Sequence, residues 1–151
     1  MRFFTRTHQI PLRLATGAFF LNSGLSKAEA DEPTAAGLHG MASHTYPFLS
    51  KLDPQRFTRL LSKAEIALGT ALLIPVVPPL LAGAAVTAFA GGLIGLYLRT
   101  PGMREEGSIR PTQQGLAVSK DIWLLGIGLS LVLEELGDRQ AHLRPVIVAE
   151  R

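Results

Sequence analysis

A small set of ionisable residues stands inside or at the edge of apolar stretches in this chain of 151 residues. The set consists of Arg13, Lys27, Glu65, Lys120, Asp121, Glu134 and Glu135. A charged side chain near the core of a membrane is costly unless it is paired or hydrated. In a hydrated cavity, such groups can hold a quinone head group, a small anion or a proton in transit. Two alternatives involve no ligand. The ionisable groups can pair with one another and so fix the helix register and topology, or the long side chains can extend until their charges reach the lipid headgroups.

The apolar stretches have the length of helices that cross a bilayer. Hydrophobic residues make up 47% of the chain and charged residues 18%, and the interval 66–98 contains no Asp, Glu, Lys or Arg. One crossing needs about 20 residues, so this interval holds more than one span, and its prolines supply a turn. We therefore predict an all-α fold, a transmembrane antiparallel four-helix bundle with a long polar first loop. The expected spans are 10–27, 58–77, 80–98 and 117–135, within a membrane domain 1–136 that precedes a polar tail 137–151. A soluble bundle with a very apolar helical hairpin is the alternative.

Antiparallel spans bring one group of ionisable residues to the same end of the bundle. Lys27 ends the first span and Glu65 lies in the first turns of the second span. Lys120 and Asp121 lie in the first turns of the fourth span. We expect Lys27 to pair with Glu65 or Asp121, and the four residues together are the candidate polar cluster of a ligand cavity.

The opposite end of the bundle holds the second predicted pair. Arg13, near the start of the first span, shares its level with Glu134 and Glu135 at the end of the fourth span. We expect Arg13 to pair with one of these two carboxylates. Four spans also place both termini on one side of the membrane, and the basic, acid-free segment 1–9 favours the cytoplasmic side.

The first apolar segment gathers its polar and small residues on one helix face. This face consists of Arg13, Gly17, Phe20, Gly24 and Lys27, spaced four, three, four and three. The face would point into a bundle while the apolar sides meet lipid. The segment also resembles a secretory signal with an A-x-A cleavage site at Ala28-Glu29-Ala30. Because Arg13 and Asn22 interrupt its apolar run, we favour a retained span.

Small residues predict where the spans pack closely. Gly17 and Gly24 are the predicted packing residues of the first span. In the third span, Gly83, Gly91 and Gly95 recur at intervals of eight and four residues. Glycine allows close backbone approach where lipid removes the hydrophobic drive for helix association. Asn22 and Ser23 are expected to form hydrogen bonds across helices. In the first loop, Thr34 is expected to cap a short helix to about residue 42. The segment 45–57 has the composition of an interfacial stretch or of an ordinary loop.

Several functional classes lack their sequence motifs. The chain has no cysteine, which excludes disulfides, thiolate catalysis and cysteine-bound iron–sulfur clusters within it. There is no G-x-S-x-G, phosphate loop, dinucleotide fingerprint or H-E-x-x-H. His39 and His44 are too few to predict a metal site, which needs three or four converging ligands. The basic residues form no cluster with interleaved aromatics, so no nucleic-acid partner is expected. No catalytic residue is predicted.

Three groups of residues together form a pattern found in known membrane proteins. They are Arg13, Gly17, Phe20, Gly24 and Lys27, then Glu65, Gly69 and Leu72, then Lys120-Asp121 followed by Trp123-Leu124-Leu125-Gly126. With this pattern the chain resembles DoxX-like membrane proteins over about residues 8–136. The resemblance implies a four-helix bundle of the bacterial inner membrane. Members are linked to oxidative stress and to sulfur or thiol metabolism, often as subunits beside soluble redox partners. The polar insert 28–56 matches no catalytic motif.

Three functions are consistent with these features. The first is an accessory or anchoring subunit of a membrane redox complex, without stand-alone activity. The second is the membrane subunit of a quinone-linked oxidoreductase, with a quinone as its cofactor near Lys27, Glu65 and Asp121. The third is a transporter of a small solute or protons, which the absence of broken or repeated spans disfavours. The expected partners are the lipid bilayer and a soluble or membrane redox protein, and association between copies of the chain is left open.

Overall fold

The structure, a computed structural model, describes the backbone of residues 5–143 and the side chains of residues 5–137. Within this range the chain is all-helical and contains no strand. The long helices are α1 (Ile10–Ala28), α2 (Glu32–Thr45), α3 (Pro54–Leu73), α4 (Pro79–Arg99) and α6 (Ile122–Leu143). Shorter turns are η1 (Thr7–Gln9), η2 (Pro47–Lys51) and α5 (Leu116–Ser119). The all-α prediction is therefore confirmed.

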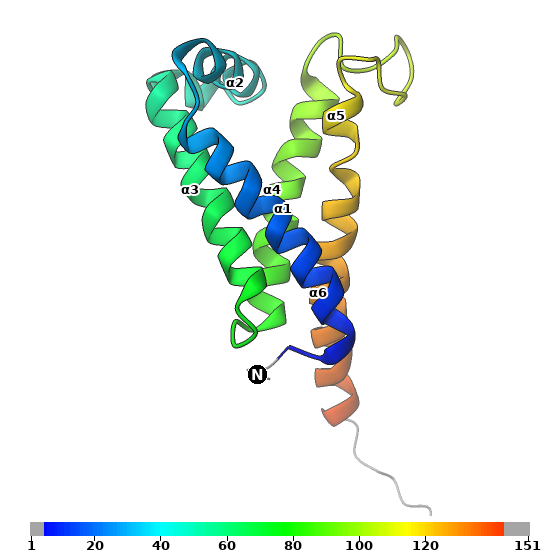
Figure 1. The fold of residues 1–151 in the computed structure, drawn as a ribbon. Coiled ribbons are helices and arrows are strands. Elements are labelled where there is room, and N and C mark those ends of the chain that lie inside the picture. Colours follow the sequence, from blue (N-terminus) through cyan, green and yellow to red (C-terminus); the bar gives the residue numbers. More distant parts are fainter. Residues whose placement is uncertain (1–4, 144–151) are drawn as a thin grey trace, which may run out of the picture.

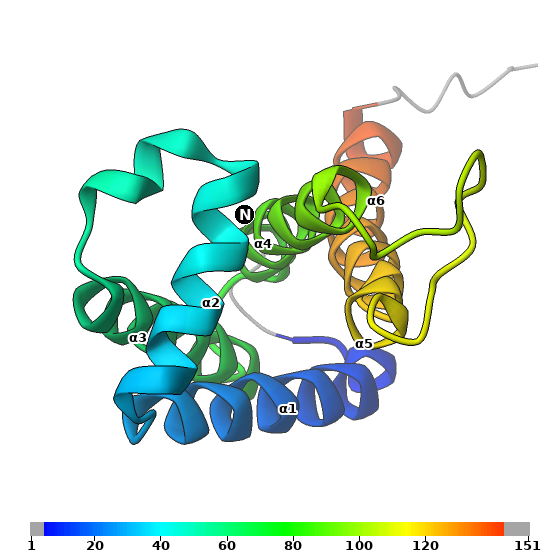
Figure 2. The same cartoon turned by 90° about the horizontal axis from the view of Figure 1, so that it is seen from above.

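The four helices that run the length of the molecule form two closely packed antiparallel pairs, α1 with α3 and α4 with α6. Figure 1 shows both pairs from the side, and Figure 2 shows them from above. We call the end where α1 finishes and α3 begins the upper end, and the end with the α3–α4 turn the lower end. The chain enters α1 at the lower end, and α6 returns there (Figure 1).

The α3–α4 connection differs in part from the hairpin that the sequence predicts. The turn 74–78 is tight, and the two helices run in opposite directions, as expected. However, α3 and α4 make few contacts with each other, because each packs mainly on a helix further along or back in the chain. Helix α3 also begins and ends before the predicted range 58–77. Proline explains both limits: Asp53 caps α3 directly before Pro54, and Pro75 and Pro78 lie in the turn.

The upper end is closed by the first loop. Helix α2 and the turn η2 lie across the ends of α3 and α4 (Figure 2). The predicted cap of α2 was wrong: Asp31, not Thr34, is the N-cap, and its carboxylate accepts the backbone N–H of Thr34 at 3.0 Å. This hydrogen bond lowers the pKa of the Asp31 carboxyl below its usual value.

Two hydrophobic clusters hold the described part of the molecule together. The larger one joins the two helix pairs, with Phe20 from α1, Leu72 from α3, Val86 from α4 and Leu131 from α6. The smaller one lies at the upper end and packs α2 and η2 on the end of α4 around Tyr97 and other residues. The larger cluster thus fixes the bundle, and the smaller one fixes its cover.

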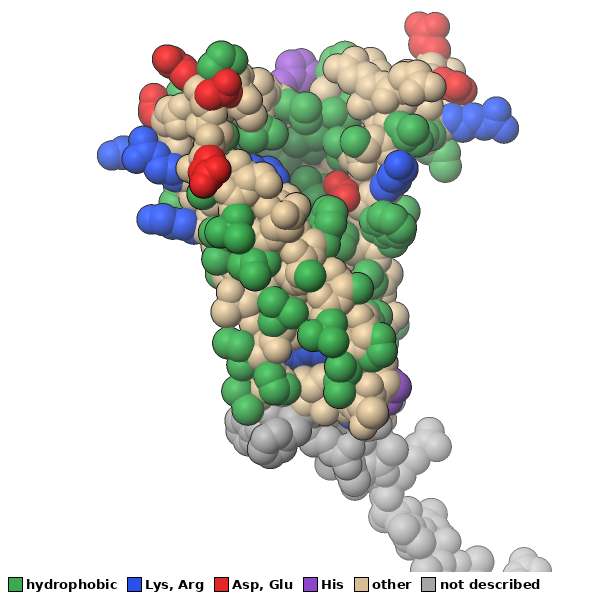
Figure 3. Space-filling model, in the orientation of Figure 1, with side chains coloured by type: hydrophobic (Ala, Val, Ile, Leu, Met, Phe, Trp, Pro, Cys, Tyr) green, Lys and Arg blue, Asp and Glu red, His purple; other side chains and the backbone are tan. Residues whose placement is uncertain are grey.

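The surface divides into an apolar body and a charged upper end. Figure 3 shows hydrophobic side chains along the body of this face and most charged side chains near the upper end. Among the described residues, Pro79–Arg99 and Leu116–Gly137 are long and apolar enough to cross a membrane. The other two predicted spans do not meet this measure. Helix α1 contains Arg13, Asn22 and Lys27, and α3 begins with several charged residues.

Candidate functional site

The upper ends of α1 and α3 are joined by a buried ion pair. The Lys27 Nζ lies 2.9 Å from the Glu65 Oε2 and 2.7 Å from the Ser23 Oγ, to which it also donates. The side chain of Glu65 is 6% exposed and that of Lys27 is 21% exposed. The predicted pairing of Lys27 with Glu65 is confirmed. The ammonium group is shared between a carboxylate and a hydroxyl, as a partly buried cation requires.

A close backbone approach one turn away places the two partners. A Cβ on Gly24 would lie 2.8 Å from the Ser62 carbonyl oxygen and 2.9 Å from the Ile66 backbone nitrogen. The Ser62 hydroxyl donates to the Gly24 carbonyl at 2.7 Å, which ties α1 to α3 directly. Only a residue without a side chain permits this distance, so Gly24 sets the level at which Lys27 meets Glu65.

Lys27, Glu65 and Asp121 line one cavity of about 420 Å³ at the upper end. Ser23 also lines it, but most of the wall is apolar. Aromatic side chains contribute from α1, α3, α4 and the first loop; they are Phe19, Phe20, Tyr46, Phe57 and Phe89. Binding pockets of roughly 300–1,000 Å³ with a few polar groups in an apolar wall are typical of small-molecule sites. The cavity has this composition.

Lys120 does not belong to this site. Its side chain is exposed and it does not line the cavity, whereas Asp121 is partly buried and does. The physical reason is an interruption of the helix. Between α5 and α6 the backbone makes tighter bonds, from Asp121 N–H to the Val118 carbonyl and from Leu124 N–H to the Asp121 carbonyl. This turn directs the neighbouring side chains differently from a continuous helix.

The first loop supplies a part of the cavity that was not predicted from the sequence. Leu38, Met41 and Ala42 of α2 line it, as do Tyr46 and Leu49. The Tyr46 hydroxyl donates to the Gly92 carbonyl at 2.8 Å and so fastens this cover to α4. The aromatic and apolar residues of segment 45–57 were the only sequence feature that pointed to this part of the wall. They did not predict it, because an interfacial stretch and a cavity wall have the same composition.

Arg13 has different partners from those predicted. Its guanidinium donates to the carbonyl oxygens of Ala71, Leu72, Ile74 and Val77 at 2.9–3.2 Å. The residue is 2% exposed. These acceptors belong to the last turn of α3 and the connection after it, where carbonyl groups have no partner within the helix. Arg13 therefore caps the C-terminus of α3 from the neighbouring helix, a position that also favours positive charge.

The carboxylates proposed for Arg13 are used otherwise. Glu134 accepts hydrogen bonds from Arg6 and Gln9, and it lies 2.7 Å from the His8 Nε2. Glu135 is 5% exposed, and its Oε1 has no hydrogen-bond partner within the described residues. The predicted pairing of Arg13 with Glu134 or Glu135 was wrong. The sequence does not show that α3 ends at the level of Arg13, where its last carbonyl groups have no donor within the helix and can accept from the guanidinium.

The predicted packing glycines divide into contacts and open positions. Gly17 and Gly24 lie against α3, and Gly83 lies against α6. Gly95 contacts the Tyr46 hydroxyl, while Gly91 has no atom within 4 Å of its Cβ position. The closest approaches also use two glycines outside the predicted set: Gly69 packs on α1 and Gly128 packs on α4. The expected hydrogen bonds of Asn22 and Ser23 across helices are not formed within the described residues: Asn22 is exposed, and Ser23 accepts from Lys27 within its own helix.

The histidines of the first loop do not form a metal centre in the described residues, where no group of three His, Cys, Asp or Glu side chains gathers. His39 lies 3.0 Å from the Leu49 carbonyl and packs edge-on to Phe57. His44 is exposed. His39 thus contributes to the cover of the cavity.

Comparison with known proteins identifies no relative. No family model, no curated protein and no solved structure matches the chain. The assignment of a function therefore rests on the cavity and on the residues that line it.

Proposed function

We propose that the chain is an integral membrane subunit whose four long helices cross the bilayer and whose upper cavity binds a quinone. The observation that carries this proposal is the 420 Å³ cavity, in which Lys27, Glu65 and Asp121 meet an otherwise apolar and aromatic wall. Membership of the DoxX-like family and a location in the bacterial cytoplasmic membrane are part of the same proposal, and the resemblance in residues 8–136 supports them.

The inward use of polar residues supports four spans rather than two. Arg13 and Lys27 both turn toward α3 and find partners there, so the charges of α1 do not face the surroundings. Phe19 and Leu25 on the same helix are exposed. A helix with apolar residues outside and paired charges inside suits lipid even when its mean hydropathy is modest.

The composition of the cavity favours a quinone over an anion. Lys27 is already neutralised by Glu65, and Asp121 adds a further carboxylate to the same wall. An anion would therefore meet excess negative charge. A quinone ring can lie against the aromatic side chains while its carbonyl oxygens accept hydrogen bonds from the ammonium group of Lys27. The hydroxyl groups of the reduced quinol can donate to Asp121 or Glu65.

The subunit would bind or position the quinone for a partner protein rather than react alone. The quinone itself supplies the electron-accepting chemistry when it is bound. Within the chain, Lys27 and Ser23 hold the polar side of the cavity, and Glu65 keeps Lys27 in place. An accessory role without a quinone is the second candidate, and the extensive exposed apolar surface supports it by offering room for a membrane partner.

Membrane insertion is tested by cysteine labelling, because the chain has no cysteine of its own. Single cysteines at Ser50, Glu106 and Thr7 would be treated with a membrane-impermeant maleimide in intact spheroplasts and in opened membranes. With four spans, Ser50 and Glu106 react on one side and Thr7 on the other. Reaction of Ser50 and Glu106 on opposite sides contradicts the four-span arrangement.

Quinone binding is tested on the protein purified in mild detergent. Lipid-soluble molecules would be extracted and quinones identified by mass spectrometry, together with any co-purifying proteins. Glu65→Gln and Asp121→Asn should each reduce the bound quinone at least about tenfold, and the exposed loop variant Glu106→Gln should retain it. A quinone-free wild-type protein with a stable partner protein would favour the accessory role.

A further inference from the structure

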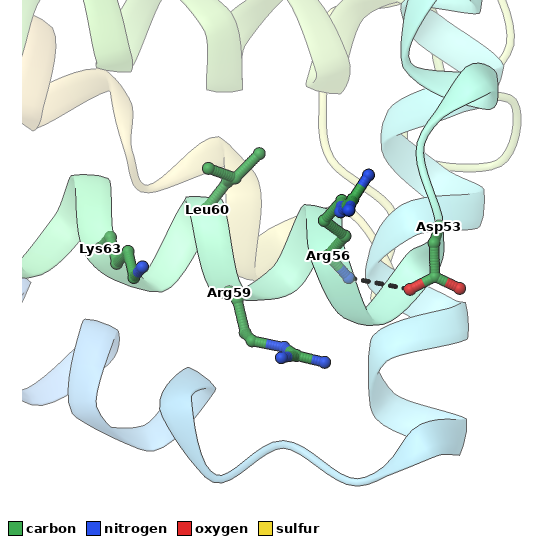
Figure 4. A pocket seen from close by; sticks show the side chains of 5 residues that line it. All are labelled: Asp53, Arg56, Arg59, Leu60 and Lys63. Carbon is green, nitrogen blue, oxygen red and sulfur yellow. Dashed lines mark hydrogen bonds between the residues drawn. The ribbon is translucent and has the colours of Figure 1, made fainter.

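The outward face of the first turns of α3 carries three cations around an exposed leucine. We call Arg56, Arg59, Leu60 and Lys63 the basic face; residues three and four apart lie on the same side of a helix. They surround a surface hollow of about 480 Å³, which Asp53 also lines at the start of the helix. Figure 4 shows Arg59 extending into the space beside α3, with Lys63 one turn further along. The hollow shares no lining residue with the proposed quinone cavity.

The cations of the basic face lack carboxylate partners. Within the described residues, no ion pair involves Arg56, Arg59 or Lys63. The nearby carboxylate of Asp53 accepts the Arg56 backbone N–H at 3.0 Å and so caps the helix (Figure 4). The hollow therefore has three positive charges against one negative charge. Like charges at helical spacing repel one another, and an anion between them would relieve this repulsion.

The surroundings of the basic face fit an anion that carries an alkyl chain. Leu60 lines the hollow and is 53% exposed, so apolar surface adjoins the cations. The basic face also lies at the upper end, where the charged surface gives way to the apolar body (Figure 3). From the upper end toward the body, cations are followed by apolar surface, just as the phosphate of a phospholipid is followed by its acyl chains.

We propose that the basic face binds the headgroup phosphate of an anionic phospholipid, with an acyl chain along Leu60. The inference rests on the membrane insertion proposed above but not on a quinone in the cavity. Basic residues at a membrane surface attract anionic lipids, and guanidinium groups are suited to hold phosphate oxygens. The lipid would fix the depth of the upper end of α3 in the bilayer.

The test is native mass spectrometry of the full chain in detergent, with added phosphatidylglycerol or phosphatidylcholine. The wild-type protein should retain phosphatidylglycerol at least about tenfold better than phosphatidylcholine. The variant R56Q/R59Q/K63Q should lose this preference. The control K51Q/R99Q/R110Q removes the same charge from other exposed positions at the upper end and should keep it. Circular dichroism verifies that both variants are folded, and Arg59→Gln alone replaces the triple variant if that variant is not.

Several results would overturn the lipid site. One is equal retention of the two lipids by the wild-type protein, and another is an unchanged preference in the folded basic-face variant. If the control K51Q/R99Q/R110Q also loses its preference for phosphatidylglycerol, the preference depends on net charge and not on the basic face. Competition by inorganic phosphate at the concentration of the lipid would indicate a site for a free anion instead. Carbonate extraction of membranes separates these outcomes from a failure of the membrane proposal, because a peripheral protein is released by this treatment.

Discussion

The two cations of α1 that turn toward α3 stand at opposite ends of the helix and are stabilised in different ways. Arg13 at the lower end is 2% exposed and donates only to backbone carbonyl groups. Lys27 at the upper end pairs with a carboxylate and lies on the wall of a cavity. The fork of a guanidinium reaches several carbonyl groups at once, whereas an ammonium group is a compact charge that suits a single strong partner.

This difference separates a structural end of the molecule from a candidate binding end. At the lower end, the acceptors of Arg13 belong to the turn that joins the two halves of the bundle, and a ligand there would have to displace several hydrogen bonds. At the upper end, Lys27 and its neighbours border open volume under a cover formed by the first loop. The comparison predicts that substitutions at the two ends affect stability and binding to different degrees.

The largest loss of stability is expected for Arg13→Met. The substitution removes the Arg13 donor from the carbonyl groups of Ala71, Leu72, Ile74 and Val77, of which Ile74 keeps the Val77 N–H. Each unsatisfied buried acceptor costs about 1–3 kcal/mol before relaxation, so we expect a total loss of about 3–5 kcal/mol. Thermal unfolding in detergent, followed by tryptophan fluorescence, measures it.

Arg13→Lys is the matched control for this prediction. It retains the positive charge but cannot reach all four carbonyl groups, so its loss should lie between those of the wild type and Arg13→Met. If Arg13→Met unfolds at the temperature of the wild type, the lower end is not held by this residue and the comparison fails.

The glycine contact that sets the upper pair should be the next most sensitive. Gly24→Ala places a Cβ against backbone atoms of Ser62 and Ile66, which cannot move aside as a flexible side chain could. We expect a loss of about 2 kcal/mol in unfolding experiments. Gly91→Ala is the control, because its Cβ position is open and alanine favours a helix. Equal losses at the two positions would mean that the α1–α3 seam does not set the level of Lys27.

A double-mutant cycle distinguishes the two ways of stabilising a cation. Lys27→Met leaves the carboxylate of Glu65 buried without its partner, and we expect a loss of about 1–2 kcal/mol because Lys27 is partly exposed. The double variant K27M/E65L should recover most of this stability while losing any bound quinone. No carboxylate substitution should rescue Arg13→Met in the same way. Rescue of Arg13→Met by Glu134→Leu would show that the lower end also depends on an ion pair.

The smallest effect is expected at the exposed cap of α2, which covers the cavity. Because the hydrogen bond to Thr34 lowers the pKa of Asp31, the ionised carboxylate stabilises the folded cap. This contribution is present above the ordinary pKa of 3.8 and is lost as the pH falls through the lowered folded value. The protection of the α2 amides against hydrogen exchange, relative to the intrinsic exchange rate at each pH, should therefore fall selectively in acid. Asp31→Asn keeps an acceptor but does not titrate here, so its exchange should show no such step.

The sequence predicted the helices and the level of each charge better than it predicted their partners. The position of Lys27 at the end of one apolar segment and of Glu65 early in the next was sufficient, because antiparallel helices bring such positions together. Arg13 could not be assigned in this way. Its acceptors are backbone carbonyl groups, which leave no trace in the identity of side chains, and they became available only because α3 ends earlier than predicted.

The composition of the cavity was predictable only in part. Asp121 and Lys120 are neighbours, and the sequence predicts both as members of the polar cluster. The break between α5 and α6 decides which of them lines the cavity. The cover formed by α2 and η2 depends on how a loop folds back over the bundle, which periodicity does not specify. The small residues were more informative, but Gly91 shows that a regular spacing alone does not establish contact.

Under the four-span proposal, the capping of α3 by Arg13 has a consequence for how the chain would enter a membrane. Helix α1 is synthesised first, yet the carbonyl groups that receive its guanidinium belong to residues 71–77. On insertion scales, an isolated arginine at the centre of a span costs about 2.5–3.5 kcal/mol, and Arg13, in the first turn of α1, would cost part of this. Under the four-span proposal, α1 is therefore a poor span until α3 emerges from the ribosome. Stable insertion of α1 would then depend on α3, and a premature stop before residue 71 should lower the fraction of α1 that inserts.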